Sequence, residues 1–417
     1  MVYLSQKYFL AGKELAAMHV VGIIAEYNPL HNGHIYHMEE SLKQAGAEYC
    51  IVAMSGNFVQ RGEPACTDKY TRAEWAVMGG ADIVTEIPSA FAVSSAERFA
   101  EGGVKTLAAT GVVTDLAFGV ETDDLNALYH LADLLDREPA NLGVYLTYHL
   151  KQGKSYPRAQ YDALQDLGVP ENELEILQQP NNILAVEYLK SIRRYAPEIR
   201  PLPIQRIGNK YNSTVLTGKL SSATAIREAL LNGDESVYDT MPMSVAAAMR
   251  FDAQFPVTFD NFGPMLLYRL RSMTLEELAA LPDVSEGFEQ VLHRAVRQAA
   301  DLPSLLELIK SKRYTLARCK RILTSALLHI PNGFAARLGA RREDLYLHVL
   351  GMKRIGRGLL SAMASKADAP VILRNADIQN CSEIARASLA IDALSTDLYA
   401  YALGRDLHRD AQSAITV

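Results

Sequence analysis

The segment from Val20 to His34 constrains the fold more than any other part of the sequence. An apolar run, Val20 to Ala25, predicts a buried strand, and an Asn-Pro turn leads from it into the pattern HxGH at the start of a predicted helix, Gly33 to Ala45. The first N–H groups of a helix have no partner within it and lie at the positive end of its dipole, so they bind anions. The segment therefore predicts a phosphate site at one edge of an α/β sheet.

Strand-like and helix-like segments continue to alternate after this turn, which is typical of a doubly wound, mostly parallel, Rossmann-like sheet. Ligands bind such sheets at the carboxyl ends of the strands, where polar motifs carry most weight. The predicted strands are Tyr49 to Ser55, Asp82 to Ile87 and Val112 to Val120, and the predicted helices are Lys69 to Met78 and Glu97 to Ala109.

The length of 417 residues predicts two to three domains, at roughly 100 to 200 residues each. We expect an α/β fold with a mostly α-helical C-terminal part. The predicted divisions are an N-terminal extension (1–19), a nucleotide-binding catalytic domain (20–240) and a mostly helical, basic region (241–417). Within the catalytic domain we expect a helical insertion at about 125–192 and an extended run at 199–207. Within the basic region, 266–350 is expected to be mainly helix, 370–373 a strand and 384–403 a helix.

Composition excludes several classes of protein. A hydrophobic content of 49% and a charged content of 22% are those of a folded globular protein, not of a disordered or collagen-like chain. The four cysteines are isolated and form no CxxC pair, so neither a disulfide framework nor a zinc knuckle is predicted, and a reducing cytoplasm fits. No apolar run reaches the length of about 18 residues that a membrane span requires, so we expect no membrane partner.

The two histidines of HxGH can both contact one phosphate, because residues three apart share a helix face. With Gly33 permitting close approach of a nucleotide, His31 and His34 would stabilise charge on an α-phosphate under attack as pyrophosphate leaves. One alternative is a pair of ordinary structural histidines. Another is a metal site with His37 as third ligand, but no HExxH glutamate is present and His37 is turned off the common face, so no metal site is predicted.

A second motif, Ser221 to Arg227, places hydroxyls before a basic residue at a predicted helix start. Ser222 and Thr224 could bind the β- and γ-phosphates with Arg227, although a serine at this position also serves as an ordinary helix N-cap. Alone the motif is weak, but together with HxGH it favours a nucleotide site.

Five ordered motifs narrow the assignment. GIIAEYNPLHNGHIYH, MSGNFVQRGEPA with DKYTRAEWA, NNILAVEYLKSI, SSATAIR and KSKRYTLARCKRIL together resemble the bacterial tRNA(Met) cytidine acetate ligase family of the HIGH-motif nucleotidyltransferase superfamily, from about Val20 to about Leu350. The chain departs from the family pattern at its start, where seventeen residues precede Met18, which is therefore an alternative initiator.

The resemblance implies a ligase that uses ATP, with Mg²⁺ as its companion ion, to activate acetate as acetyl-adenylate. The acetyl group would pass to N4 of the wobble cytidine of elongator tRNA(Met), releasing AMP and pyrophosphate. His31, His34 and Arg227 would be catalytic. With Ser222 and Thr224, the implied ATP-binding residues are Ile24, Ala25, Glu26, Tyr27, Asn28, Pro29, Leu30, His31, Asn32, Gly33, His34, Ile35, Tyr36, His37, Gly119, Asn182 (or, equally, Asn181) and Arg206.

The polar loop Ser55 to Ala65 follows the second strand and carries Asn57, Gln60 and Arg61, so it could hold acetate or cytosine. Lys69 and Arg72 could face the same crevice. The alternatives are an exposed loop and ordinary charges on a helix surface.

The stretch from Val291 to Arg357 holds fourteen lysines and arginines against four acidic residues, a net +10 in a chain of net charge −6. Clustered basic residues bind nucleic-acid phosphates, although solvated helix faces are also charged. We expect tRNA phosphates to contact Lys312, Arg313, Arg318 and Arg321. The competing hypotheses are an adenylyltransferase for a small substrate, which needs no basic half, and a non-catalytic RNA-binding protein, which needs no intact HxGH.

Overall fold

The computed structural model describes residues 18–206, 220–252, 255–411 and 414–417. Among these residues, eight strands form one sheet in the order β5-β4-β1-β2-β3-β6-β7, with β8 also paired to β6. The first five strands are parallel, and β6 runs antiparallel to β3. Their bounds are β1 Val20–Ala25, β2 Tyr49–Ser55, β3 Ile83–Ile87, β4 Asp115–Val120, β5 Arg200–Gln205, β6 Leu347–Met352, β7 Val371–Ile372 and β8 Ile415–Thr416.

Both faces of the sheet are buried, because apolar residues alternate between two cores. In β2, Ile51 and Ala53 face one core, which includes α5 and α10, whereas Val52 and Met54 face the other, which includes α2 and α3. The helices of this half are α2 Asn32–Ala45, α3 Lys69–Met78, α4 Ser89–Ala92, α5 Ala96–Ala109, α6 Leu125–Arg137, α7 Ala140–Lys151, α8 Tyr156–Asp166, α9 Glu171–Ile176, α10 Pro180–Tyr195 and α11 Ala223–Leu231.

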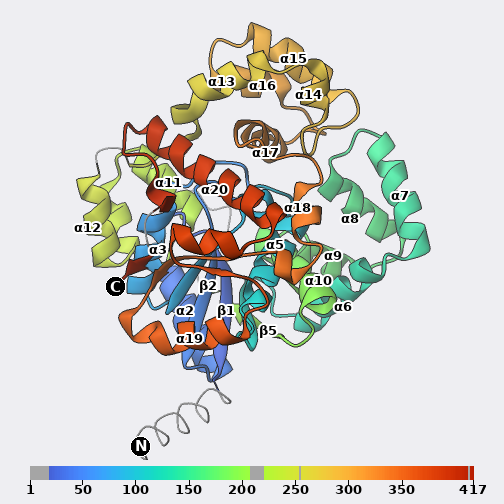
Figure 1. Ribbon diagram of the computed structural model, residues 1–417. Coiled ribbons are helices and arrows are strands. Elements are labelled where there is room, and N and C mark those ends of the chain that lie inside the picture. The colour runs from blue at the N-terminus through green and yellow to red at the C-terminus, as the bar shows by residue number, and fades with distance from the viewer. Residues whose placement is uncertain (1–17, 207–219, 253–254, 412–413) are drawn as a thin grey trace, which may run out of the picture.

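The second half of the chain is mostly helical, and Figure 1 shows α13 to α16 as a separate group of helices at the top, with α17 beneath it. Its helices are α12 Met243–Phe251, α13 Gly263–Ser272, α14 Leu275–Ala279, α15 Phe288–Gln298, α16 Leu302–Ile309, α17 Leu316–Leu327, α18 Phe334–Leu338, α19 Arg357–Lys366 and α20 Glu383–Ala402, with short 3-10 helices that include η6 Arg409–Ala411. None of the helices in the described ranges is long and apolar enough to cross a membrane.

One sequence prediction was wrong at its end. Residues 347–350 were placed in a helical stretch, but they form β6, which extends the sheet beyond β3. Every residue from Leu347 to Gly351 is buried, so the run shows no helical alternation of polar and apolar residues, and a short buried run fits strand or helix equally well. The strand predicted at 370–373 and the helix predicted at 384–403 are confirmed as β7 and α20.

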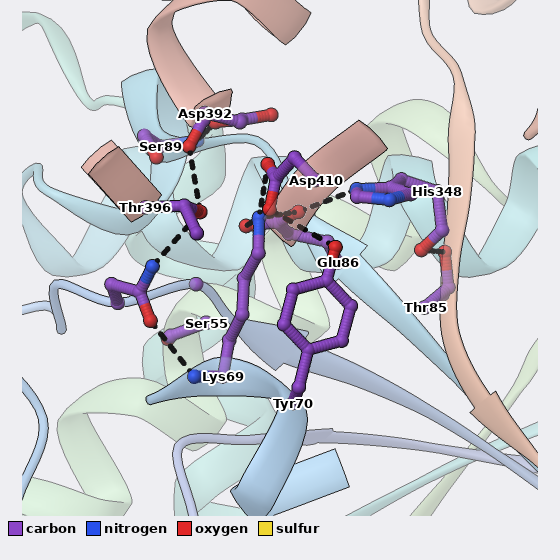
Figure 2. Close-up of polar contacts among 12 residues, drawn as sticks. Ser55, Lys69, Tyr70, Thr85, Glu86, Ser89, His348, Asp392, Thr396 and Asp410 are labelled. Atoms are coloured by element: carbon purple, nitrogen blue, oxygen red, sulfur yellow. Dashed lines mark hydrogen bonds and ion pairs between the residues drawn. The ribbon is translucent and has the colours of Figure 1, made fainter. Parts of the chain in front are cut away.

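A buried ion cluster joins the C-terminal part of the chain to the sheet. The ammonium of Lys69 donates to both carboxylate oxygens of Glu86 on β3, at 2.9 and 2.7 Å, and to Oδ2 of Asp410 on η6, at 2.8 Å. Figure 2 shows Lys69 pointing between these carboxylates, with His348 of β6 beside Glu86. Glu86, His348 and Asp410 could together hold a metal ion, but the Lys69 ammonium already lies between the two carboxylates as their cation.

The same cluster reaches α20 through Asp392, which accepts hydrogen bonds from the Ser89 N–H (2.9 Å) and the Tyr346 hydroxyl. Burial, and next the negative charge of Glu86, raise the pKa of Asp392 to about 7. A further carboxylate close to Glu86 is therefore costly to ionise, and the single ammonium of Lys69 is what allows Glu86 and Asp410 to be charged in the interior.

We predict that Lys69→Met lowers the free energy of unfolding by about 3–5 kcal/mol, because it leaves two carboxylates buried without their cation. Urea unfolding followed by circular dichroism measures this loss. Lys43→Met is the matched control, since Lys43 pairs with Glu40 while its side chain is 76% exposed, so its midpoint should stay close to that of the wild type. Equal midpoints for both variants would show that the buried cluster does not need its lysine.

Candidate active site

A cavity of about 210 Å³ opens at the carboxyl ends of β1, β2, β4 and β5. Its wall is formed by the turn after β1, the loop after β2, the end of β4, the N-terminal half of α10, the end of β5 and the start of α11. This is the edge at which parallel α/β sheets bind their ligands.

The HxGH turn lines the cavity, and its two histidines cap the first turn of α2. His31 is the N-cap of α2, and its Nδ1 accepts the N–H of Gly33 at 3.1 Å, while Nδ1 of His34 accepts the N–H of His31 at 3.3 Å. The imidazole rings stack with centroids 3.7 Å apart. A Cβ on Gly33 would lie 2.9 Å from the His31 ring, so glycine is required here to make room for that ring.

Both histidines are neutral at physiological pH. Burial, and then the charges of Arg206 and Arg227, lower the pKa of His31 to about 3, and burial together with neighbouring His31 and Arg206 holds the pKa of His34 well below its ordinary value. Because Nδ1 of each ring accepts a backbone N–H, the proton of each neutral ring is on Nε2. Each ring is thus prepared to donate one hydrogen bond without bringing a charge.

Positive charge in the cavity comes from three arginines, Arg61 of the loop after β2, Arg206 and Arg227. Arg206 follows β5, and Arg227 of α11 donates to the carbonyl of Asn28 in the turn at 2.6 Å. Ser222 caps α11 by accepting the N–H of Ala225 at 3.1 Å, and Thr224 lines the cavity beside it. Two imidazole N–H groups, three guanidinium groups and two hydroxyls around one space are the donor set that a polyphosphate requires.

Of the predicted residues Gly119 on β4 and Asn182 on α10, only Gly119 lines the cavity. Gly119 lines the cavity, and a Cβ there would come within 3.2 Å of the Arg206 side chain. The side chain of Asn182 is buried behind the wall, where its Oδ1 accepts the N–H of Glu121 at 2.8 Å and its amide donates to Gln179. Asn181, the alternative, lines the cavity and donates to Glu121 at 2.9 Å.

Most of the predicted segment Ile24 to His37 faces the cavity. Ten of its residues line the wall: Ile24, Ala25, Glu26, Tyr27, Asn28, His31, Gly33, His34, Tyr36 and His37. Pro29, Leu30, Asn32 and Ile35 do not line it; the side chain of Leu30 is buried, and Asn32 donates to the Asp239 carbonyl at 3.2 Å. A role in ATP binding stays a prediction for all fourteen residues of the segment.

One part of the loop after β2 lines the cavity, and another part is buried against α3 and α20. Gln60 and Arg61 line the cavity, whereas Asn57 is buried and bonds Thr396 and the N–H of Lys69. Neither Lys69 nor Arg72 faces the cavity, because both are fully buried. Arg72 instead donates to the carbonyls at which the first two strands end: Glu26 (2.6 Å), Ser55 (3.2 Å), Gly56 and also Thr67 (3.1 Å).

Sequence reasoning missed the apolar part of the wall. Val59, Phe99, Phe118, Leu184 and Tyr188 line the cavity from four different elements. Phe99 and Tyr188 occupy apolar positions of amphipathic helices, where the pattern predicts only burial against the sheet. No local signal separates such a residue from an ordinary core residue.

The predicted RNA-binding residues gather on one part of the surface, around α17. The guanidinium of Arg318 lies 4.0 Å from the Tyr314 ring centroid and donates to the carbonyl of Asp283 at 2.7 Å. Arg321 pairs with the Asp283 carboxylate at 3.1 Å, Arg313 pairs with Glu286, and Lys312 is exposed. Three of the four predicted residues therefore also hold the segment 283–286 against α17.

Comparison with known proteins agrees with this geometry. The family model described as HIGH Nucleotidyl Transferase matches residues 18–413. The tRNA(Met) cytidine acetate ligase of Acetivibrio thermocellus is 37% identical over 96% of this chain and 99% of its own length, and that of Caldanaerobacter subterraneus subsp. tengcongensis is 38% identical over 92% and 96%.

Solved structures give the same result. Thermotoga maritima TmcAL in its apo form superposes with a TM-score of 0.89 at 33% identity, covering 96% of this chain and all of the other. The same enzyme bound with alpha-thio ATP superposes with a TM-score of 0.87 at 32% identity and the same coverage. The resemblance found in the sequence is thus confirmed, and the chain belongs to the HIGH nucleotidyltransferase family, among the tRNA(Met) cytidine acetate ligases.

Proposed function

We propose that this protein is an ATP-dependent ligase that acetylates a cytidine of tRNA(Met). Acetate would attack the α-phosphate of ATP to give acetyl-adenylate and pyrophosphate, and N4 of the wobble cytidine of the elongator tRNA would then take the acetyl group and release AMP. The observation that carries this proposal is the joint placement of Nε2–H imidazoles and three arginines around one cavity, in a chain that aligns with these ligases over nearly its whole length.

The neutral histidines suit the first step. As negative charge develops on the oxygens of the attacked α-phosphate, Nε2–H donors of His31 and His34 can stabilise it without first losing a proton. Arg227 and the α11 hydroxyls lie where they can hold the leaving pyrophosphate, because the guanidinium is fixed to the Asn28 carbonyl beside the turn.

Mg²⁺ would accompany the phosphates of ATP. The carboxylates of the described cavity wall are Glu26 and Glu63, and Glu63 pairs with Lys320, so the wall provides no carboxylate cluster for the ion. Its ligands would be mostly phosphate oxygens and water, as is common for Mg²⁺ bound with a nucleotide. We also infer a cytoplasmic location, because the proposed substrate is a tRNA and all four cysteines are free thiols.

The activity is tested with radiolabelled acetate, ATP and bulk tRNA, followed by nucleoside analysis. We expect acetate-dependent exchange of pyrophosphate into ATP without tRNA, and N4-acetylcytidine with AMP when tRNA is present. Release of ADP and phosphate would contradict attack at the α-phosphate. Exchange that depends on a different small acid would favour an adenylyltransferase for a small substrate, and RNA binding without exchange would favour a non-catalytic protein.

We predict that His34→Ala lowers the rate of acetate-dependent exchange by about one hundredfold or more, the scale expected when a donor to transition-state charge is removed. The matched control is His130→Ala, since His130 is exposed and pairs with Glu173 on α9, away from the cavity. Full exchange by a folded His34→Ala variant would remove this histidine from the mechanism.

We also predict that replacing Lys312, Arg313, Arg318 and Arg321 by Ala weakens tRNA binding and flattens its salt dependence, by roughly one unit of log-log slope per lost phosphate contact. ATP affinity should stay close to that of the wild type. Binding curves for both ligands at several salt concentrations measure this, and a variant with Arg137, Lys151 and Arg158 replaced by Ala controls for loss of basic charge elsewhere. Loss of ATP binding with tRNA binding intact would reverse our assignment of the two sites.

A further inference from the structure

The carboxylate of Glu26 occupies a distinctive position in the cavity. Glu26 follows the last residue of β1 and precedes the HxGH turn, and its side chain is only partly buried. Within the described part of the wall the two carboxylates are Glu26 and Glu63, and Glu63 is ion-paired with Lys320. Glu26 has no ion pair among the described residues, so a negative charge faces a cavity that otherwise presents donors to phosphate.

The Glu26 side chain is directed toward the loop after β2. Its Oε1 accepts the N–H of Gln60 at 2.9 Å, while the amide of Gln60 donates to the Ser94 carbonyl at 3.1 Å, just before α5. This leaves the second carboxylate oxygen for a ligand. The hydrogen bond to Gln60 directs the Glu26 carboxylate toward the loop after β2, whereas the two histidines are held on α2 by their own capping bonds.

The same loop is the contact between the cavity and the proposed RNA-binding helix α17. The hydroxyl of Thr324 donates to the Gly62 carbonyl at 2.8 Å, and Lys320 pairs with Glu63. Gly62 has a φ of 74°, and a Cβ on it would lie 2.3 Å from the Arg321 backbone nitrogen. No side chain fits at position 62 between loop and helix, so RNA on α17 would lie beside the loop that Glu26 contacts through Gln60.

Planar apolar side chains line other parts of the same cavity. Phe99 of α5, Phe118 of β4 and Tyr188 of α10 line the cavity together with Val59 of the loop. An unstacked base packs on such surfaces, and a carboxylate is the side chain that accepts a hydrogen bond from the exocyclic amine of cytosine. The combination suits cytosine better than it suits acetate, whose negative charge Glu26 would repel.

We propose that Glu26 is a catalytic residue that binds N4 of the acceptor cytosine and accepts its proton. This inference rests on the proposed function. The lone pair of N4 would form a bond to the carbonyl carbon of acetyl-adenylate, the bond from that carbon to the phosphate oxygen would break, and AMP would leave with the electron pair. The N4 proton would pass to the Glu26 carboxylate and then to water.

The test separates transfer from activation by supplying chemically prepared acetyl-adenylate. Single-turnover formation of N4-acetylcytidine on tRNA is measured for the wild type and for Glu26→Gln, which keeps a hydrogen-bond acceptor of similar shape but cannot take the proton. We expect transfer to slow by about one hundredfold or more, the scale of a lost general base, and acetate-dependent exchange to fall much less. The matched control is Glu343→Gln, which removes an exposed carboxylate outside the cavity wall and should show no such difference between the two steps.

Each result decides the question. Transfer by Glu26→Gln at the wild-type rate would overturn the proposal, and so would an equal loss of exchange and transfer, since the carboxylate would then serve ATP or its Mg²⁺. If Glu26→Gln does not fold, Glu26→Asp is compared with the wild type in the same two assays. Only a loss of transfer that clearly exceeds the loss of exchange supports the proposal. Failure of the proposed function would appear differently, as absence of acetate-dependent exchange in the wild type.

Discussion

The guanidinium of Arg72 holds the ends of two central strands in one place. It lies fully buried on α3 and donates to the carbonyls of Glu26, Ser55, Gly56 and Thr67. Strand ends leave carbonyls without ladder partners, and such groups are costly to bury unpaired. One planar cation with five N–H donors satisfies three of them, as well as the Thr67 carbonyl before α3, and fixes the point from which both the HxGH turn and the loop after β2 begin.

This arrangement connects the candidate nucleotide site to α17, the helix that we propose binds RNA, through few contacts. The turn and the loop start from the same set of carbonyls, the turn carries the phosphate donors, and the loop packs directly against α17. A movement of α17 would act on the loop through the contact at Gly62 and the pair Lys320–Glu63. The loop and α17 are therefore joined by a side-chain hydrogen bond, an ion pair and close packing at Gly62.

Local patterns were sufficient for much of the fold. The strand at 20–25 and the helix at 69–78 match the structure at both ends, because turn residues and caps such as Asp68 bound strongly periodic segments. The pair formed by HxGH and Ser222 to Arg227 was also brought to one cavity, as the two motifs predict. What failed depends on distant contacts: β6 is a strand because β3 offers it an edge, and Lys69 and Arg72 are buried because carbonyls and carboxylates from other segments surround them. Charged residues at a helix start give no local sign of such partners.

The contribution of the C-terminal segment bears on how the protein is made. Asp410 is the second carboxylate that pairs with Lys69, and Arg409 donates to Asp68, the residue that caps α3. In addition, β8 pairs with β6. A chain still on the ribosome presents its N-terminal residues first, so Lys69 and Glu86 are made long before Asp410, which lies 341 residues beyond Lys69. A chain that stops shortly before Asp410 would keep the cavity residues and the Lys69–Glu86 pair but lack the second carboxylate that joins η6 to α3. Docking of the C-terminal segment on α3 and β6 can thus take place only after nearly the whole chain has been made.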